Sequence, residues 1–317
     1  MPRPVCAGGE DAGHSAYFSR PSHTMNPKPY FPATARSSLR ERSTLGALLR
    51  VLTLLGLSAC GSSEPAPASD PAVVHESFTL DSQVLGEQRR LNVYTPPGYA
   101  DSDTIYPVLY MPDGGIEEDF PHIAASVDAL IREQAIAPVL VVGIENTERR
   151  RDLTGETTVE SDRDVAPVIG GSDDFRRFIS QELIPEIGTR YRVNTQRAIV
   201  GESLAGLFVM ETFLAHPNLF DRYIAMSPSL WWNDHTLVRQ AKNRLPQLAD
   251  MHRVLWFTTA DEADIYPYTD QLAETLTSDA PRDLVWHYVP MKGQHHNTIF
   301  RAAKAQAFRT ALWKDEP

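Results

Sequence analysis

The sequence predicts an α/β fold in which a mainly parallel β-sheet carries helices on both faces. From residue 197 onwards, short apolar runs typical of strands alternate four times with longer stretches of helical periodicity. Because parallel neighbours need a crossover connection, this alternation places helices against both faces of the sheet. A length of 317 residues and a hydrophobic content of 42% are sufficient for one large domain with a buried core.

The elements are expected in a definite order. Residues 74–81 and 89–95 predict an antiparallel pair, with Gly86 and Glu87 in the turn. The apolar run 106–111 predicts a buried strand, followed by a helix near 122–135, a strand at 138–144 and one amphipathic helix over 172–190. The remaining strand and helix pairs are 197–202 with 204–216, 221–226 with 234–247, 253–258 with 265–278, and 283–289 with 298–313. The sheet therefore has about eight strands.

Charge and cysteine content limit the partners. The net charge is −11, but residues 1–60 carry seven basic and three acidic residues, which leaves −15 for the remainder. An acidic body argues against a nucleic-acid partner, because phosphate binding needs a basic patch. The cysteines are Cys6 and Cys60, so we expect neither a disulfide framework nor a cysteine-based metal site in the folded part. We expect no cofactor and no metal, and the oligomeric state stays open.

Residues 1–59 are interpreted as a leader. Met25 is a better start than Met1, so residues 1–24 are interpreted as a start-site extension. Arginines precede the apolar run 45–59, which is typical of a secretory signal peptide and too short for a transmembrane helix. Residues 60–72 are rich in Ser, Pro and Ala and predict a flexible tether, and residues 73–317 predict the folded domain.

The apolar run ends in Leu-Ser-Ala-Cys-Gly, which resembles a bacterial lipobox. By this resemblance, Cys60 carries a lipid after cleavage. The protein is then exported and tethered to the cell envelope, facing the periplasm or the outside, and it meets the membrane through this anchor only. A plain signal peptide with an incidental cysteine is the alternative.

The junction between the strand 197–202 and the helix 204–216 carries the candidate nucleophile. Its sequence, Gly-Glu-Ser-Leu-Ala-Gly, differs by one methyl group from the G-x-S-x-G nucleophile elbow. The elbow serine occupies a strained turn, so its neighbours two residues away must be very small, and Ala205 is tolerable. We predict Ser203 as the nucleophile of an α/β-hydrolase fold and the Leu204 N–H as an oxyanion donor. A Gly-Ser turn in a Rossmann-type fold is the alternative.

A serine hydroxyl needs a general base, usually a histidine that a carboxylate orients. The chain order of this fold is serine, acid, histidine, which leaves His295 and His296 after the last strand. Three acid candidates follow the strand 253–258, namely Asp261, Glu262 and Asp264. Glu262 is preferred, with Asp261 next, although the three could also be a solvated helix start.

The whole domain, from about residue 74 to 313, resembles the esterase D and enterobactin-esterase branch of the α/β-hydrolases, the putative-esterase superfamily. Five stretches carry the resemblance: YPVLYMPDGG at 106–115, VVGIENTERRRDLTG at 141–155, DFRRFISQELIPEIGTRY at 174–191, GESLAGLF at 201–208 and FDRYIAMSPSLWW at 220–232. The resemblance implies a serine esterase that acts by acyl transfer on a small-molecule ester.

The resemblance also implies roles for single residues around the serine. The segment that begins at His296 fits the family pattern H-x-[ST]-[VI], which favours His296 over His295. The turn Asp113-Gly114-Gly115 is similar to the loop that donates the second oxyanion N–H, so Gly114 and Gly115 are candidates for it.

Two further pairs of residues are candidate substrate contacts. Arg149 and Arg151 match the family's R-x-R-D-L-T, and one of them would face an anionic or polyphenolic substrate. In the structural alternative, Arg151 simply pairs with Asp152 and holds a loop. Trp231 and Trp232 either wall the pocket or lie in the core.

The substrate is less defined than the reaction. A short-chain or carbohydrate-acyl ester competes with a siderophore trilactone, and an inactive ligand-binding lipoprotein is the alternative outside the enzymes. The family usually has His before the serine and Gly two after it, where this chain has Glu202 and Ala205. Glu202 could repel anionic acyl groups or hold an arginine.

Overall fold

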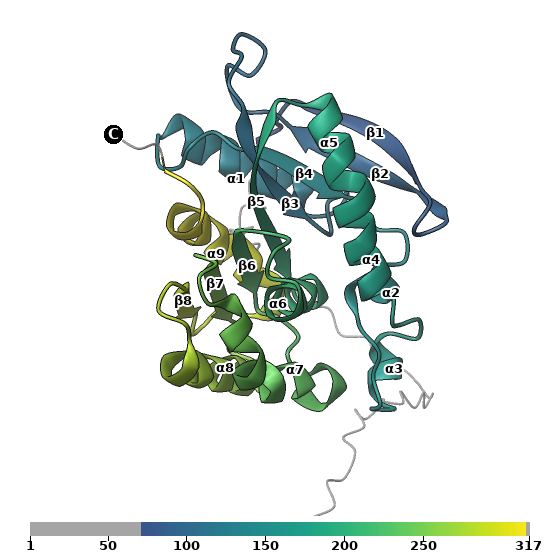
Figure 1. The fold of residues 1–317 in the computed structure, drawn as a ribbon, viewed down its shortest axis with the longest axis vertical. Coiled ribbons are helices and arrows are strands. Elements are labelled where there is room, and N and C mark those ends of the chain that lie inside the picture. Colours follow the sequence, from purple (N-terminus) through teal and green to yellow (C-terminus); the bar gives the residue numbers. More distant parts are fainter. Residues whose placement is uncertain (1–70, 315–317) are drawn as a thin grey trace, which may run out of the picture. The chain divides into compact units, whose positions relative to one another are not determined.

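A computed structural model describes residues 71–314, in which eight strands form one sheet (Figure 1). The strands are β1 (His75–Ser82), β2 (Glu87–Tyr94), β3 (Tyr106–Met111), β4 (Leu140–Ile144), β5 (Val193–Glu202), β6 (Arg222–Met226), β7 (Val254–Thr259) and β8 (Val285–Pro290). Their order is β1-β2-β4-β3-β5-β6-β7-β8. The strand β2 is antiparallel to both of its neighbours, and all pairs from β4 to β8 are parallel. The predicted mainly parallel sheet of about eight strands is confirmed.

Helices cover both faces of this sheet. They are α1 (Phe120–Arg132), α2 (Arg149–Leu153), α3 (Asp162–Val165), α4 (Ser172–Phe178), α5 (Ile184–Arg190), α6 (Leu204–Ala215), α7 (Trp232–Arg244), α8 (Tyr266–Asp279) and α9 (His296–Ala311). Buried side chains of α1 and α9 belong to one hydrophobic cluster, and those of α4 to α8 belong to the other. The side chains of β3 point alternately into one cluster and the other, so both faces of this strand are covered. This explains why all six residues of β3 are buried and apolar.

The parallel crossovers bring the ends of several strands to one edge of the sheet. The strand β5 ends at Glu202 and leads directly into α6, so Ser203 lies at its carboxyl end. The loops after β3, β7 and β8 leave from the same edge, because these strands are parallel to β5. Ligands of open α/β sheets bind outside the carboxyl ends of the strands, so this edge is where a site is expected.

The expected single helix over 172–190 is wrong in detail. The segment consists of α4, a π-helical turn at Ile179–Leu183 and α5. The Ile184 N–H donates to the carbonyl of Ile179, five residues earlier. Pro185 follows at once and lacks an N–H for a regular helical turn, which explains why the helix widens there.

Three smaller features were not expected from the sequence. The helices α2 and α3 have five and four residues, too few to produce a periodic pattern. The helix α7 is kinked near its start, where Asn233, Asp234 and His235 have positive φ values. These deviations all lie in connections or at helix ends, and none alters the sheet.

The leader 1–59 with Cys60, and most of the tether 60–72, lie outside the described residues. Within 71–314, every helix is too short or too polar to cross a membrane.

Candidate active site

The backbone at Ser203 has the geometry that the elbow motif predicts. Its φ and ψ are 60° and −122°, and its N–H donates to the Met226 carbonyl at 3.0 Å on the adjacent strand. A Cβ on Gly201 would lie 2.6 Å from the carbonyl carbon of Ala205, so only glycine fits there. The turn therefore lifts the serine between β5 and α6 at a strained position that its surroundings impose.

His296 is the histidine that faces Ser203. Its Nε2 lies 2.8 Å from the Ser203 Oγ, which is hydrogen-bond distance. His295 precedes it as the N-cap of α9, where its side chain accepts a backbone N–H and its own N–H donates to the Thr298 hydroxyl. The structure thus brings His296 to Ser203 and gives His295 a capping role.

Glu262 is the carboxylate nearest to the other ring nitrogen of His296. One of its oxygens accepts the His296 backbone N–H at 2.6 Å, and the other lies 3.8 Å from Nδ1. Asp261 instead lines a separate cavity beside Tyr266 and Lys292. Asp264 acts on the histidine only through its charge.

Burial lowers the pKa of His296, and the nearby carboxylates of Glu262 and Asp264 oppose this effect without cancelling it. The imidazole is therefore kept neutral at neutral pH, the state in which it can accept a proton. Its Nδ1 has no hydrogen-bond partner among residues 71–314. The Glu262 Oε2 lies 3.8 Å from this nitrogen, and a shift of the side chain of less than an ångström would bring the two atoms within hydrogen-bond range.

Glu202, next to the serine, also faces the histidine. Its Oε1 lies 3.3 Å from the His296 Nε2. Burial raises the pKa of Glu202 to about 8, with further repulsion from Asp119, Asp113 and Glu262, while Arg149 opposes the shift. The sequence indicated that Glu202 departs from the family pattern, but not that its side chain would turn toward the base.

In the loop after β3, the N–H groups of Gly114 and Gly115 already have acceptors. The Gly114 N–H donates to the Ile144 carbonyl at 2.9 Å, and the Gly115 N–H donates to the Glu118 carboxylate at 2.7 Å. A Cβ on Gly114 would lie 2.2 Å from the Ile144 backbone nitrogen, so this glycine is required for packing against β4. Neither N–H is free in this structure. The Leu204 N–H is at the first position of α6, where helices lack an internal acceptor.

Arg149 is held by Asp113, which lies in the loop that follows β3. Its guanidinium donates two hydrogen bonds to the Asp113 carboxylate, at 2.6 and 2.7 Å. The Asn146 side chain donates to the same carboxylate. The backbone of Asp113 has a positive φ of 55°. The positive charge of Arg149 acts on both Glu202 and His296. Of Arg149 and Arg151, Arg149 is therefore the one whose charge acts on the groups beside Ser203.

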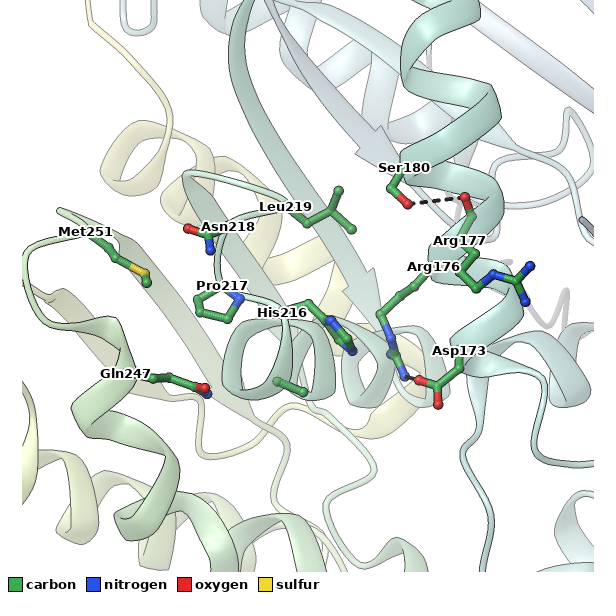
Figure 2. A pocket seen from close by; sticks show the side chains of 11 residues that line it. Asp173, Arg176, Arg177, Ser180, His216, Pro217, Asn218, Leu219, Gln247 and Met251 are labelled. Atoms are coloured by element: carbon green, nitrogen blue, oxygen red, sulfur yellow. Dashed lines mark hydrogen bonds and ion pairs between the residues drawn. The ribbon is translucent and has the colours of Figure 1, made fainter.

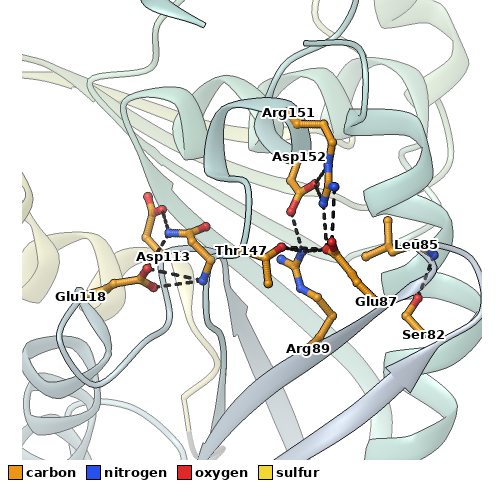
Figure 3. A network of polar contacts seen from close by, with 10 residues as sticks. Ser82, Leu85, Glu87, Arg89, Asp113, Glu118, Thr147, Arg151 and Asp152 are labelled. Carbon is orange, nitrogen blue, oxygen red and sulfur yellow. Dashed lines mark hydrogen bonds and ion pairs between the residues drawn. The ribbon is translucent and has the colours of Figure 1, made fainter. Parts of the chain in front are cut away.

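Arg151 belongs to a structural network instead (Figure 3). It donates to Glu87 at 2.8 Å and to Asp152 at 2.7 Å. Arg89, which is 1% exposed, donates to the same two carboxylates. This arrangement matches the alternative in which Arg151 and Asp152 hold a loop.

The two tryptophans differ in their surroundings. Trp232 is buried, and its Nε1 donates to the Gly155 carbonyl at 3.2 Å, so it is a core residue. Trp231 is half-buried beside it. The residue of this segment that contacts Ser203 is Ser229, whose hydroxyl lies 3.5 Å from the Ser203 Oγ and whose N–H donates to the Ser203 carbonyl. The sequence contained no signal for that contact beyond the Ser-Pro-Ser motif.

A cavity of about 650 Å³ lies elsewhere (Figure 2). It is lined by α4 and by the loop that follows α6, with Arg176 and His216 on its wall. The helix α6 has 12 residues, about 18 Å, and Ser203 is at its other end. Arg176 is already paired with Asp173 and Ser172. Across residues 71–314, no cluster of three or more His, Cys, Asp or Glu side chains could hold a metal.

Comparisons with known proteins agree on the family. A sequence model of the family described as "Putative esterase" matches residues 82–311. The ferri-bacillibactin esterase BesA of Bacillus subtilis (strain 168) is 30% identical over 253 residues, which cover 70% of this chain and 83% of that protein. The siderophore triacetylfusarinine C esterase of Aspergillus fumigatus is 32% identical over 192 residues, covering 56% of this chain and 63% of that protein.

Solved structures show the same architecture. An IroE-like serine hydrolase from Shewanella oneidensis has a TM-score of 0.69 at 28% identity, with 75% of this chain and 79% of that chain covered. The siderophore hydrolase EstB from Aspergillus nidulans has a TM-score of 0.63 at 23% identity, with 78% and 96% covered, and supports the fold alone. The predicted α/β-hydrolase fold is confirmed.

Proposed function

Because this chain belongs to the putative esterase family and is thus a hydrolase of ester bonds, we propose that Ser203 is its nucleophile. The observation that carries the proposal is the 2.8 Å separation between Ser203 Oγ and His296 Nε2 at a strained strand-to-helix turn. A neutral imidazole at this distance is positioned to act as general base.

The reaction would follow acyl transfer. His296 takes the Ser203 proton while the oxygen attacks the ester carbonyl, and the Leu204 N–H at the start of α6 stabilises the oxyanion. The imidazolium then returns its proton to the leaving alkoxide, and the acyl group remains on Ser203. Water, deprotonated by His296, hydrolyses the acyl-enzyme. Glu262 fixes the His296 backbone and offers a negative charge to the imidazolium.

A fluorophosphonate probe followed by peptide mapping tests the mechanism. We expect label on Ser203, and Ser203→Ala should lower kcat/KM for p-nitrophenyl acetate by about 10⁴-fold or more. Full activity of Ser203→Ala, or label on another residue, would contradict the proposal.

A siderophore ester is the substrate class that the relatives support. Two of them are named for ester hydrolysis of ferri-bacillibactin and of triacetylfusarinine C. Arg149, beside the nucleophile, supplies a positive charge for such polar ligands. Turnover of ferric and iron-free trilactones should exceed that of p-nitrophenyl acetate. The reverse order would favour a short-chain or carbohydrate-acyl esterase instead.

We also propose that Cys60 anchors the protein to the envelope, on the basis of the Leu-Ser-Ala-Cys motif. Growth with a clickable palmitate analogue should label the full chain but not its Cys60→Ala variant. Equal label on both would rule the anchor out.

A further inference from the structure

The base of this site has two oxygen neighbours on the same ring nitrogen. Ser203 Oγ lies 2.8 Å and Glu202 Oε1 lies 3.3 Å from the His296 Nε2. That Glu202 oxygen is buried and makes no hydrogen bond to any of residues 71–314, so at 3.3 Å from Nε2 it is an unsatisfied polar atom next to the base. An imidazole nitrogen has a single lone pair, so two hydroxyl donors at this position would compete for it.

We propose that Glu202 is a positioning residue that controls whether His296 Nε2 is available to Ser203. In its neutral form, the carboxyl group donates its proton toward Nε2 and takes up part of the lone pair that must accept the serine proton. In its ionised form, it has no proton to donate, and its negative charge stabilises the imidazolium that forms when Ser203 attacks. This inference rests on the proposed function.

The surroundings of Glu202 decide which form is present. Three carboxylates from three other segments face it, namely Asp113 after β3, Asp119 at the start of α1 and Glu262 after β7, and they favour the neutral form. Arg149 on α2 favours the ionised form, and His296 on α9 is the group that it contacts. Burial exceeds all of these effects and raises the pKa of Glu202 to about 8.

The direction of the pH effect follows from this raised pKa. A carboxyl group with a pKa near 8 is about one tenth ionised at pH 7 and about nine tenths ionised at pH 9. His296 has a lowered pKa and is already neutral over this range. If kcat/KM follows the ionised fraction of Glu202, it should rise about tenfold from pH 7 to pH 9, separately from the rise at lower pH that deprotonation of His296 produces.

The test compares pH profiles of kcat/KM on p-nitrophenyl acetate, with Ser203→Ala subtracted as the blank. Glu202→Gln keeps a neutral donor at every pH, so its profile should lack the rise near pH 8 and fall about tenfold below the wild type at pH 9. Glu202→Ala removes the competitor, so it should also lack the rise but should equal or exceed the wild type at pH 7. Parallel profiles of wild type and Glu202→Gln would overturn the proposal.

A matched control and a second measurement keep the outcome interpretable. Glu211→Gln changes another buried carboxyl group with a raised pKa, which faces Arg176 and lies two turns into α6; its profile should keep the wild-type shape. The rate of fluorophosphonate labelling of the wild type should show the same rise near pH 8 without any variant. A flat rate there would overturn the inference alone, whereas active Ser203→Ala would overturn the proposed function.

Discussion

At the scale of single residues, two neighbouring candidates for the acid differ in the direction of their side chains. Glu262 and Asp261 are neighbours in the sequence, yet their carboxylates point to different places. Glu262 holds the His296 backbone and lies 3.8 Å from its Nδ1, whereas Asp261 lines a separate cavity. Adjacent residues on a loop separate in this way when the chain turns into a helix, here α8.

Exchange of each carboxylate for its amide should distinguish the two. Glu262→Gln keeps an oxygen that can accept the His296 N–H but loses the charge that favours the imidazolium. We expect kcat/KM to fall about 10²-fold or more, by analogy with removal of the charge in serine triads. Asp261→Asn is the control and should stay within about twofold of the wild type. A loss confined to Asp261→Asn would assign the acid to that residue.

The sequence was informative about residues whose type is dictated by chemistry or backbone geometry. Ser203 was predicted as the nucleophile because the elbow needs very small neighbours, and His296 was predicted as the base because chain order and a family pattern converge on it; the structure places the two side chains 2.8 Å apart. The role of Gly114 and Gly115 as oxyanion donors stays a prediction, whereas the hydrogen bonds of their N–H groups to Ile144 and Glu118 depend on how a loop packs against β4, which one sequence does not show. The contact of Glu202 with His296 depends on a rotamer, which one sequence does not encode visibly.

At the scale of elements, a charged network ties β2 to α2. The Glu87 carboxylate on β2 accepts hydrogen bonds from Arg89, Thr147 and Arg151. Burial disfavours its ionised form, but the hydrogen bonds from Arg151, Thr147 and Arg89 outweigh this and lower the pKa of Glu87 from 4.5 to about 2. The network thereby holds α2, the helix that begins at Arg149.

The lowered pKa of Glu87 predicts a pH-dependent contribution to stability. A carboxyl group whose folded-state pKa is depressed stabilises the fold above its unfolded pKa, and this is lost as the pH falls toward 2. Glu87→Gln should lower the free energy of unfolding by about 1 kcal/mol at pH 7, since the group is partly exposed. Urea titrations at pH 7, 4 and 3 should show the difference shrinking.

The control for this prediction is Glu145→Gln, which removes an exposed carboxylate 3.8 Å from Arg90. It should change the unfolding free energy by less than about 0.5 kcal/mol at every pH. A Glu87→Gln effect that stays constant down to pH 3 would mean that the side chain acts through packing rather than charge.

The elements themselves differed in how far they could be predicted. The strands β3, β4 and β7 are continuous apolar runs because helices bury both of their faces, so their apolar character located them to within two residues. The strand β5 begins at Val193, four residues before its predicted start, because its first half is polar and partly exposed. The segment 172–190 showed a helical pattern, but Pro185 forces a π turn that apolar spacing does not reveal. The helices α2 and α3 are held by side-chain contacts, such as those of Asp162 with Thr157 and the Asn233 N–H, and not by their own periodicity.

At the scale of the whole molecule, topology gathers residues that are distant in the chain. Ser203, Glu262 and His296 follow β5, β7 and β8, and Asp113 and Arg149 follow β3 and β4. Parallel strands deliver all these loops to one edge of the sheet, so the order of serine, acid and histidine was enough to predict that they meet. The net charge of the side chains at this edge could not be predicted from the sequence, because it depends on which acidic side chains point toward Ser203 and His296.

That net charge is negative, which gives a prediction about substrates. Residues 61–317 carry a net charge of −15, and the carboxylates of Asp113, Asp119 and Glu262 act on Glu202 beside Ser203, with Arg149 as the opposing charge. Like charges slow the approach of an anionic substrate, and salt screens this repulsion over a Debye length of about 10 Å at 0.1 M.

Two esters with the same leaving group separate this effect from chemistry. With p-nitrophenyl hemisuccinate, an anion, kcat/KM should rise about two- to fivefold as the ionic strength increases from 0.02 to 0.3 M. With neutral p-nitrophenyl acetate, it should change by less than about 1.5-fold over the same range. If salt instead lowers kcat/KM for the anion, Arg149 dominates the field at the site, and an anionic siderophore is attracted to it. In that case Arg149→Gln should abolish the salt dependence, because the attractive charge is removed while an amide can still donate to Asp113.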